Sequence, residues 1–508
     1  METSLIYAVY PNYFQFDKTG INPAANNFFY PFSPFPSKTL YIYPLLSYNS
    51  LHTFTIMFTR EKGRDILSED KDEILNKPFA EIGEKLHLLL QTGALLMENG
   101  ADSDRTVRDM RRAAAFMGID SEHMNQHVLY TTLMLNVSDS RHSYTEFCKY
   151  QKHGINMTTL SAVSKLTWRA LAQNYSLDAF RRQLNNIRNL PRAYPVWLTA
   201  LGAGAACGGF CKLFGGSWLD FLLTAICSLL GFYVRRLCTA YAFNTYATIA
   251  ITSFVTTILA WSTQFLTGGL NWYPLIACTL FLVPGIPLIN AVDDLLNNFI
   301  VAGMTRAMHT LLVVSSMTFG IVIAIRLCGV TDFTSVQLTP DTVYFSQAIA
   351  AAIGAVGFSI IFNVPPRILP VVAVGGIITV LIRNISVLEF GLSQTAGSFL
   401  GAAVVGLIAL KAIHWFHTPN IVMTIPSAIP MIPGVLLYRL LFALLNIHFI
   451  TANDFFTSFK SGIDAITIII GIAVGVAIPN IFIHRQIERR KQDNVQKLLA
   501  KRYAEAED

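Results

Sequence analysis

Charged residues are scarce in the second part of this chain. Lys, Arg, Asp and Glu make up 14% of the 508 residues, against roughly 25% in a typical soluble protein. Between Tyr194 and His484, ten basic and eight acidic residues are the only charges among 291 positions. So few charges cannot cover the surface of a soluble domain of that size. The composition therefore predicts a membrane protein with a soluble N-terminal part.

Several patterns that would indicate other classes of protein are absent. No Lys/Arg stripe interleaves with aromatic residues, so the net charge of +6 gives no reason to expect a nucleic-acid partner. The sequence contains no GxxxxGK(S/T), GxSxG or HExxH motif, which disfavours an ATP-driven pump and the common hydrolases. The seven cysteines form no paired framework, and we expect Cys207 and Cys211 to pack in the core rather than bind metal. We expect no cofactor.

Residues 1–56 show neither helical nor strand periodicity. The first 56 are rich in Tyr, Phe, Asn and Pro and lack the basic start, long apolar stretch and cleavage site of a signal peptide. We predict a disordered or loosely structured extension at 1–76. One hypothesis is that Met57 opens the natural chain.

Residues 77–192 have the pattern of a cytoplasmic α+β domain. Apolar residues at helical spacing and Gly or Asp at the expected ends predict helices, and a β-like run predicts a hairpin. The expected helices are Phe79–Asn99, Ser103–Met117, Met157–Asn174 and Ser176–Asn189, and the expected strands are Val128–Val137 and Ser143–Lys149.

Two groups of polar residues in this domain invite a functional interpretation. Arg105, Arg108, Arg111 and Arg112 follow one helix, and we expect them to form a solvated face rather than a ligand site. His123 and His127 are four residues apart, but they are expected in a loop before the first strand, where they would not share a helical face. A metal or catalytic role is the less favoured interpretation of these histidines.

Ten apolar runs are long enough to cross the roughly 30 Å of hydrocarbon in a bilayer. The first five are Tyr194–Phe214, Trp218–Val234, Tyr241–Ser262, Trp272–Ala291 and Thr305–Leu327, and the second five are Val343–Asn363, Ile368–Ile382, Gln394–Ile413, Ile425–Leu445 and Ile463–His484. An offset of 149 residues places Pro284 and Gly285 on Pro433 and Gly434 and Gly208 on Gly357. We predict two five-span repeats, at 193–335 and 336–484, and a basic cytoplasmic tail at 485–508.

An odd number of spans per half means that the second half enters the membrane upside down. The sequence thus predicts an α-helical polytopic membrane protein with ten transmembrane helices in a 5+5 inverted repeat, an architecture of many secondary transporters. The distribution of Lys and Arg places both termini in the cytoplasm.

The fourth span of each half is interrupted by Pro and Gly. Proline removes a backbone donor and clashes with the preceding turn, so the helix must kink or break. A pair of broken helices at matching places indicates a transport site near the bilayer midplane, although packing kinks are the alternative. The expected substrate-binding residues are Pro284, Gly285, Pro287, Asn290, Pro430, Pro433, Gly434, Tyr438 and Arg439.

Two neighbouring carboxylates, Asp293 and Asp294, follow the first break. A carboxylate inside a bilayer is costly and usually functional, so these residues are predicted to couple transport to protons. The alternative places them at the cytoplasmic interface beside Arg306. Arg439 could bind a substrate carboxylate through two hydrogen bonds.

Several stretches resemble the bacterial threonine/serine exporter family. They are GALLMENGADSDR at Gly93–Arg105, YPVW at Tyr194–Trp197, FGGSWLD at Phe214–Asp220 and VPGIPLIN at Val283–Asn290. The family's usual Glu-Thr is Asp102-Ser103 here, and its threonine-proline stretch is replaced by Leu133–Asn136. The resemblance implies a cytoplasmic N-terminal domain fused to ten spans, location in a bacterial plasma (inner) membrane, and proton-driven export of threonine or serine. Split relatives are associated with succinate export.

Two classes of function remain open. The favoured one is a secondary exporter of a small carboxylate-bearing solute, threonine/serine first and a dicarboxylate such as succinate second. The other is a membrane-anchored enzyme or sensor that acts through residues 77–192. The expected partners are a small-molecule substrate and the lipid bilayer, without nucleic acid, and self-association of the chain stays open.

Overall fold

The computed structural model describes residues 69–119, 121–138, 142–150, 153–173, 175–330, 343–416, 418–448 and 450–478. The predictions for residues 1–68, including the hypothesis on Met57, and for the tail at 485–508 lie outside the described residues. The described part is mostly helical and contains one small sheet.

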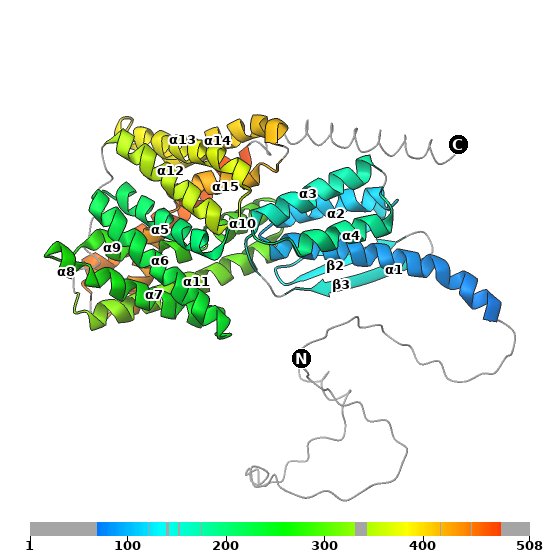
Figure 1. Ribbon diagram of the computed structural model, residues 1–508, viewed down its shortest axis with the longest axis horizontal. Helices are drawn as coiled ribbons and strands as arrows, with labels where there is room; N and C mark the ends of the chain where they lie inside the picture. Colours follow the sequence, from blue (N-terminus) through cyan, green and yellow to red (C-terminus); the bar gives the residue numbers. More distant parts are fainter. Residues whose placement is uncertain are drawn as a thin grey trace, which may run out of the picture. The chain divides into compact units, whose positions relative to one another are not determined.

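Four helices and a three-stranded sheet come first along the chain, and we call them the N-terminal domain (Figure 1). The helices are α1 (Glu69–Glu98), α2 (Ser103–Phe116), α3 (Met157–Ala172) and α4 (Leu177–Arg188), and a short 3-10 turn, η1, spans Ser121–His123. Helix α1 runs across the predicted boundary at 76/77, and the division of the chain into regions stays a prediction. Asp102 caps α2 as expected, because its side chain accepts from the backbone N–H of Arg105.

The sheet corrects part of the prediction. Its strands β1 (Met124–Val128), β2 (Thr132–Ser138) and β3 (Ser143–Lys149) pair antiparallel in chain order. The expected strand Val128–Val137 is therefore only partly correct: Val128 ends β1, a turn follows at 129–131, and the remaining residues belong to β2. His127 lies in β1 rather than in a loop. The β2–β3 hairpin is confirmed, with Ser138 opposite Ser143. The turn between β1 and β2 lies within the same β-like run, so the alternation of apolar and polar residues does not mark where β1 ends.

The arginines of α2 do not form the single solvated face that we expected. Arg105 is 8% exposed and reaches Asp102. Arg112 pairs with Asp109 over 2.9 Å and lies 4.1 Å from the ring centre of Trp168 on α3. Only Arg111 is exposed. Asp102 and Asp109 are each three residues before their arginine on the same helix or its cap, whereas Trp168 comes from α3, and the helical pattern of α2 does not show which of its sides packs on another helix.

Eight helices are long and apolar enough to cross a membrane, and two bent helix pairs raise the number to ten if each pair counts as one span, among the residues the structure describes. The long ones are α5 (Val196–Leu213), α6 (Trp218–Ala240), α7 (Thr245–Ser262) with the short α8 (Gln264–Thr267), α11 (Ile300–Leu327), α12 (Tyr344–Ile361), α13 (Leu369–Leu388) after η3 (Pro366–Ile368), α14 (Gln394–Phe416) and a last helix over Ala452–Ile478. Each of the ten predicted apolar runs overlaps one of these helices or bent pairs, and residues 479–484 of the last run lie outside the described residues.

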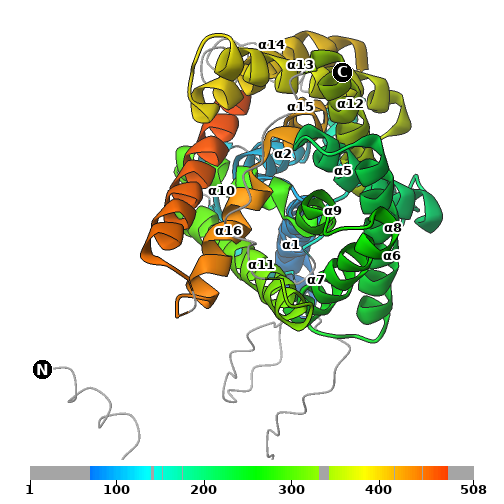
Figure 2. The same cartoon turned by 90° about the vertical axis from the view of Figure 1, so that its left-hand side faces the viewer.

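The two bent pairs lie inside a ring of the longer helices (Figure 2). The first pair is α9 (Trp272–Ala277) with η2 (Leu280–Leu282) and then α10 (Gly285–Leu296), bent by 58°. The second is α15 (Ile421–Ala428) with η4 (Ile429–Met431) and then α16 (Gly434–Leu445), bent by 55°.

Helices α5 and α12, which correspond to the first apolar runs of the two predicted halves, pack closely through small residues. A Cβ atom on Gly357 would lie 2.6 Å from the carbonyl oxygen of Gly202, and one on Gly209 would lie 2.8 Å from that of Ala350. Such close approach of backbones is how membrane helices associate without a hydrophobic driving force between them. The first helix of one half is thereby joined to the first helix of the other.

Candidate functional site

Both breaks have the same backbone conformation. Val283 and Ile432 are extended, with φ/ψ of −62/125° and −64/126°, and Pro284 and Pro433 follow at −80/65° and −82/56°. Pro287 does not interrupt α10 because it is the third residue of that helix, where backbone N–H groups have no helical partner. The interruption predicted from Pro and Gly is therefore located at 283–284 and 432–433.

The two breaks contact each other reciprocally. A Cβ atom on Gly285 would lie 2.7 Å from Cδ1 of Ile432, and one on Gly434 would lie 3.2 Å from Cγ2 of Val283. Ile432 and Val283 are separated by the same 149 residues as Gly434 and Gly285. The contact of Gly285 with Ile432 is thus repeated by Gly434 with Val283, with the two breaks exchanged. Such a reciprocal contact is typical of two segments related by a two-fold axis.

Hydroxyl groups satisfy the carbonyls that the breaks release. Ser228 on α6 donates to the carbonyl of Cys278, and Thr379 on α13 donates to that of Ser427, both over 2.8 Å. Cys278 and Ser427 are again 149 residues apart. Irregular backbone inside a membrane protein is tolerated only where such partners or water satisfy it, so these bonds stabilise the broken form of both spans.

A pocket of about 180 Å³ lies beside the second break. Its walls are the ends of α5 and α13, the start of α14, the break itself with the start of α16, and one residue of the last helix. The residues that line it are Leu213, Phe214, Arg383, Asn384, Val387, Leu388, Gln394, Ser398, Pro430, Met431, Ile432, Pro433, Val435, Leu436, Arg439 and Ile468.

The pocket is basic. Arg383 and Arg439 both line it, and no acidic side chain does so among the described residues. Ser398 is 1% exposed, and its hydroxyl has no hydrogen-bond partner among the described residues. The first turn of α16, at the positive end of the helix dipole, adjoins the same space. Such a site suits a small anion.

A larger groove of about 460 Å³ lies between α7, α11 and α16. Its lining is mostly apolar, with Phe319, Leu441, Leu444 and Leu445, and contains no charged residue among the described ones. This groove suits an acyl chain better than a polar solute, so the smaller pocket is the candidate site.

The predicted site residues separate into four places. Pro430, Pro433 and Arg439 line the pocket, whereas Pro284, Gly285, Pro287 and Gly434 form or flank the packed centre of the breaks. Tyr438 is 1% exposed and donates to the carbonyl of Ile276 on α9 over 2.9 Å. Asn290, Asp293 and Asp294 lie further along α10, away from the pocket.

Asn290 and Asp294 belong to a polar cluster with the N-terminal domain. Asp294, fully buried, accepts from Nε of Arg306 on α11 over 3.1 Å and from the backbone N–H of Ser103 over 2.8 Å. Asn290 donates to the carbonyl of Gly100 over 3.0 Å. The pairing of Asp294 with Arg306, weighed in the sequence as an alternative, is therefore present.

Sequence reasoning missed four polar residues of the pocket: Arg383, Asn384, Gln394 and Ser398. A signal existed for the first two, because the offset that aligns the breaks places Arg235 on Asn384, next to Arg383. Gln394 and Ser398 lie one turn apart at the start of α14 and gave no local signal.

Eight to ten candidate spans among the described residues, two interior breaks in contact and a basic pocket beside one of them define a polytopic membrane protein with the organisation of a transporter. Two family models, both describing threonine/serine exporters, match residues 87–328 and 347–482. The chain belongs to this threonine/serine exporter family.

Relatives from three bacteria illustrate the range of the family. The chain is 29% identical over 246 residues to the "Probable succinate transporter subunit YjjP" of Escherichia coli, covering 48% of this chain and 94% of that protein. It is 23% identical over 302 residues to the "Probable threonine/serine exporter" of Mycobacterium tuberculosis, covering 56% and 55%. An uncharacterized protein of Haemophilus influenzae is 21% identical over 399 residues, 78% of this chain and 94% of its own. No solved structure matches the chain.

Proposed function

We propose that this protein is a secondary active exporter of a small carboxylate-bearing solute, which binds in the pocket beside the second break. The observation that carries the proposal is the reciprocal contact of the two breaks next to a pocket with two arginines. Broken helices at matching places of two repeats are where secondary transporters bind their substrates. Arg439, from the first turns of α16, offers two parallel donors to a carboxylate.

The architecture that goes with this function is a 5+5 inverted repeat. Helices α5, α6, α7, the first bent pair and α11 correspond in order to α12, α13, α14, the second bent pair and the last helix. The matching contacts of Gly285 with Ile432 and of Gly434 with Val283 support a two-fold relation between these two sets of helices. With both termini cytoplasmic, in a bacterial plasma membrane, the N-terminal domain lies inside and the pocket faces outwards.

The pocket and the N-terminal domain lie at opposite ends of α5, and the distance between them fits this orientation. Ala193, just before α5, donates to Asn363 at the end of α12, next to the N-terminal domain. The other end of α5, at Leu213 and Phe214, lines the pocket. Eighteen helical residues span about 27 Å at 1.5 Å per residue. The pocket is therefore nearly one bilayer core away from the N-terminal domain.

Threonine or serine is the first candidate solute. The M. tuberculosis relative carries that name, and the α-carboxylate of an amino acid would bind Arg439. Its ammonium group would need oxygen acceptors, which the side chains of Gln394 and Ser398 provide.

A dicarboxylate is the second candidate, and one observation favours it. Two guanidinium groups, Arg383 and Arg439, line the pocket without an acidic neighbour in its described lining. A solute with two carboxylates satisfies both charges, whereas an amino acid satisfies one. The E. coli relative is named a succinate transporter subunit.

Proton coupling is assigned to Asp293 and Asp294. Asp294 is fully buried, and Asp293, one position earlier, is partly buried. Protonation of either removes a buried negative charge on α10, the helix that follows the first break. That change would alter the balance between the two orientations of the transporter.

The test is flux in liposomes that contain the purified full-length chain and an imposed pH gradient. Labelled threonine, serine and succinate are offered in parallel, and Arg439→Gln is compared with Lys460→Gln, a charge change in the last helix outside the pocket lining. We expect gradient-driven movement of at least one solute, lost in the first variant only. Absence of flux for all three in a folded protein would contradict the proposal.

The enzyme or sensor alternative has its own discriminating measurement. A chain that lacks the membrane part but keeps a solute-dependent activity or ligand affinity in residues 77–192 would favour that alternative. Under the exporter proposal, removal of the membrane part abolishes every solute-dependent signal.

A further inference from the structure

A short segment of the N-terminal domain is buried against the membrane helices. This docking segment, residues 100–105, connects α1 to α2, and its residues Ala101, Asp102 and Ser103 are at most 2% exposed. Gly100 adopts φ +92°, a left-handed conformation that favours glycine. The turn directs the carbonyls of Gly100 and Ala101 towards α10 and α11.

Four hydrogen bonds hold the docking segment on three different helices. Asn290 on α10 donates to Gly100, and Arg306 on α11 donates from Nη2 to Ala101 over 3.3 Å. The backbone N–H of Ser103 donates to Asp294 on α10. Nη2 of Arg105 donates to Asn420, the cap of α15, over 3.4 Å. The segment thus bridges α10 of the first break and α15 of the second.

The position of the docking segment mirrors that of the solute pocket. Asn290 and Arg439 are separated by the same 149 residues as the two Pro-Gly breaks, so Asn290 occupies the place in α10 that Arg439 occupies in α16. Beside Arg439 lies a pocket. Beside Asn290, the corresponding space is filled by Gly100.

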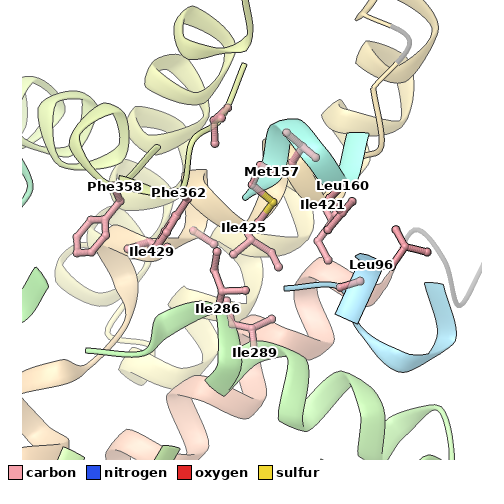
Figure 3. Close-up of a cluster of buried hydrophobic side chains, with 14 of the residues drawn as sticks. Leu96, Met157, Leu160, Ile286, Ile289, Phe358, Phe362, Ile421, Ile425 and Ile429 are labelled. Atoms are coloured by element: carbon pink, nitrogen blue, oxygen red, sulfur yellow. The ribbon is translucent and has the colours of Figure 1, made fainter. Parts of the chain in front are cut away.

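Apolar side chains close the space behind the docking segment. Leu96 of α1 and Met157 and Leu160 of α3 belong to one buried cluster with Ile286 and Ile289 of α10 and Ile421, Ile425 and Ile429 of the second bent pair (Figure 3). All eight are at most 8% exposed. A water-filled route from this side to the breaks would have to separate these side chains.

A second contact holds the N-terminal domain independently of the segment. The backbone N–H groups of Met157 and Thr158 at the start of α3 donate to the carbonyls of Phe362 and Asn363 after α12, over 3.0 and 3.1 Å. Asn156 and Asn363 also bond through their side chains over 2.7 Å. The domain can therefore keep this attachment while the docking segment leaves α10 and α15.

We infer that the docking segment is the cytoplasmic gate of the transport path, with Arg306 and Asp294 as its latch. Seated as described, it occupies the inward-facing counterpart of the solute pocket and holds the exporter closed to the cytoplasm. Solute enters from the cytoplasm only after the segment separates from the two broken helices. The inference rests on the proposed function, because it takes the breaks to be the solute site.

The first test tethers the gate. In a full-length background without native cysteines, Arg105→Cys and Asn420→Cys are joined by a bifunctional thiol reagent that a reductant cleaves. We expect tethering to slow solute flux at least about tenfold and cleavage to restore it. The matched control joins Glu81→Cys to Lys85→Cys, which replace an ion pair within α1, and leaves flux unchanged. If the tethered protein keeps a flux within twofold of the same variant before cross-linking, the gate is overturned while the exporter stays in place.

The second test measures opening of the gate by thiol labelling instead of transport. Its result is therefore interpretable even if the proposed function is wrong. Ile289→Cys, buried behind the segment, reports access of a membrane-impermeant maleimide from the cytoplasmic face. Arg306→Gln, or Asn290→Ala if that variant does not fold, should raise the labelling rate about tenfold. Arg326→Gln, on the same helix but bonded to Asn446 at its other end, should leave the rate unchanged. Equal labelling in all variants would contradict the gate.

Discussion

Arg306 on α11 donates from Nε to Oδ2 of Asp294 on α10 over 3.1 Å, and both side chains are at most 4% exposed. The same carboxylate accepts from Ser103 of the N-terminal domain. One buried ion pair therefore links a broken membrane helix, an unbroken one and the domain that precedes them. The following predictions concern this pair and the sites that lie around it.

Arg306→Ala should destabilise the folded protein strongly. Removing one partner of a buried pair leaves an uncompensated charge, which costs about 3–5 kcal/mol. The double variant Asp294→Asn with Arg306→Gln keeps neutral hydrogen-bonding groups and should lose less. Thermal unfolding in detergent measures both. A double variant that is less stable than Arg306→Ala would show that the charges themselves stabilise the fold.

Gly434→Leu should stop transport without preventing insertion. A side chain at position 434 meets Leu280 at 2.9 Å, so the two breaks must move apart. The matched control is Gly269→Ala, where a Cβ atom has nothing within 4 Å. Flux and membrane content are measured together. Normal flux in Gly434→Leu would show that the breaks are packing kinks without a role in transport.

The two arginines of the pocket should respond differently to different solutes. If the solute is a dicarboxylate, Arg383→Gln and Arg439→Gln should each raise the apparent KM by about tenfold or more, since a charge-assisted hydrogen bond contributes about 1.5–3 kcal/mol. If the solute is threonine or serine, only Arg439→Gln should do so. Arg439→Lys should also weaken binding, because an ammonium group cannot donate two parallel bonds. Unchanged KM in both glutamine variants would exclude this pocket as the binding site.

His153 should make the stability of the N-terminal domain depend on pH. Burial, His309 and Arg306 lower the pKa of His153 from 6.5 to about 4, and its ring stacks on Tyr130 at 4.2 Å. The unfolded chain therefore binds a proton that the folded chain does not, and stability falls as the pH drops from about 6.5 towards 4. Because the ring is partly solvent-exposed, we expect an effect on the order of 1 kcal/mol.

The check for His153 is the melting temperature between pH 4.5 and 7. His153→Phe keeps a stacked ring and should flatten the dependence, whereas His123→Phe, at an exposed position, should not. An equal pH dependence in the wild-type chain and in His153→Phe would exclude His153 as its source.

Local chemistry made much of the fold predictable. The helix starts at Asp102 and Ser176 follow from side chains that cap the adjacent N–H groups. The breaks at Pro284 and Pro433 follow from the missing donor of proline. The strand boundaries failed at Val128, where no periodic signal separated β1 from β2.

The sequence by itself determined that the chain is a membrane protein with ten candidate spans and two matching interruptions, because desolvation of charge and the backbone chemistry of Pro and Gly act within a few residues. Only the tertiary structure decided that Arg383 joins Arg439 in one pocket and that Ser103 meets Asp294 across 191 residues. Those pairings depend on how helices distant in the chain pack against one another. No local sequence pattern predicts that packing, so the contacts of the proposed gate could be found only in the tertiary structure.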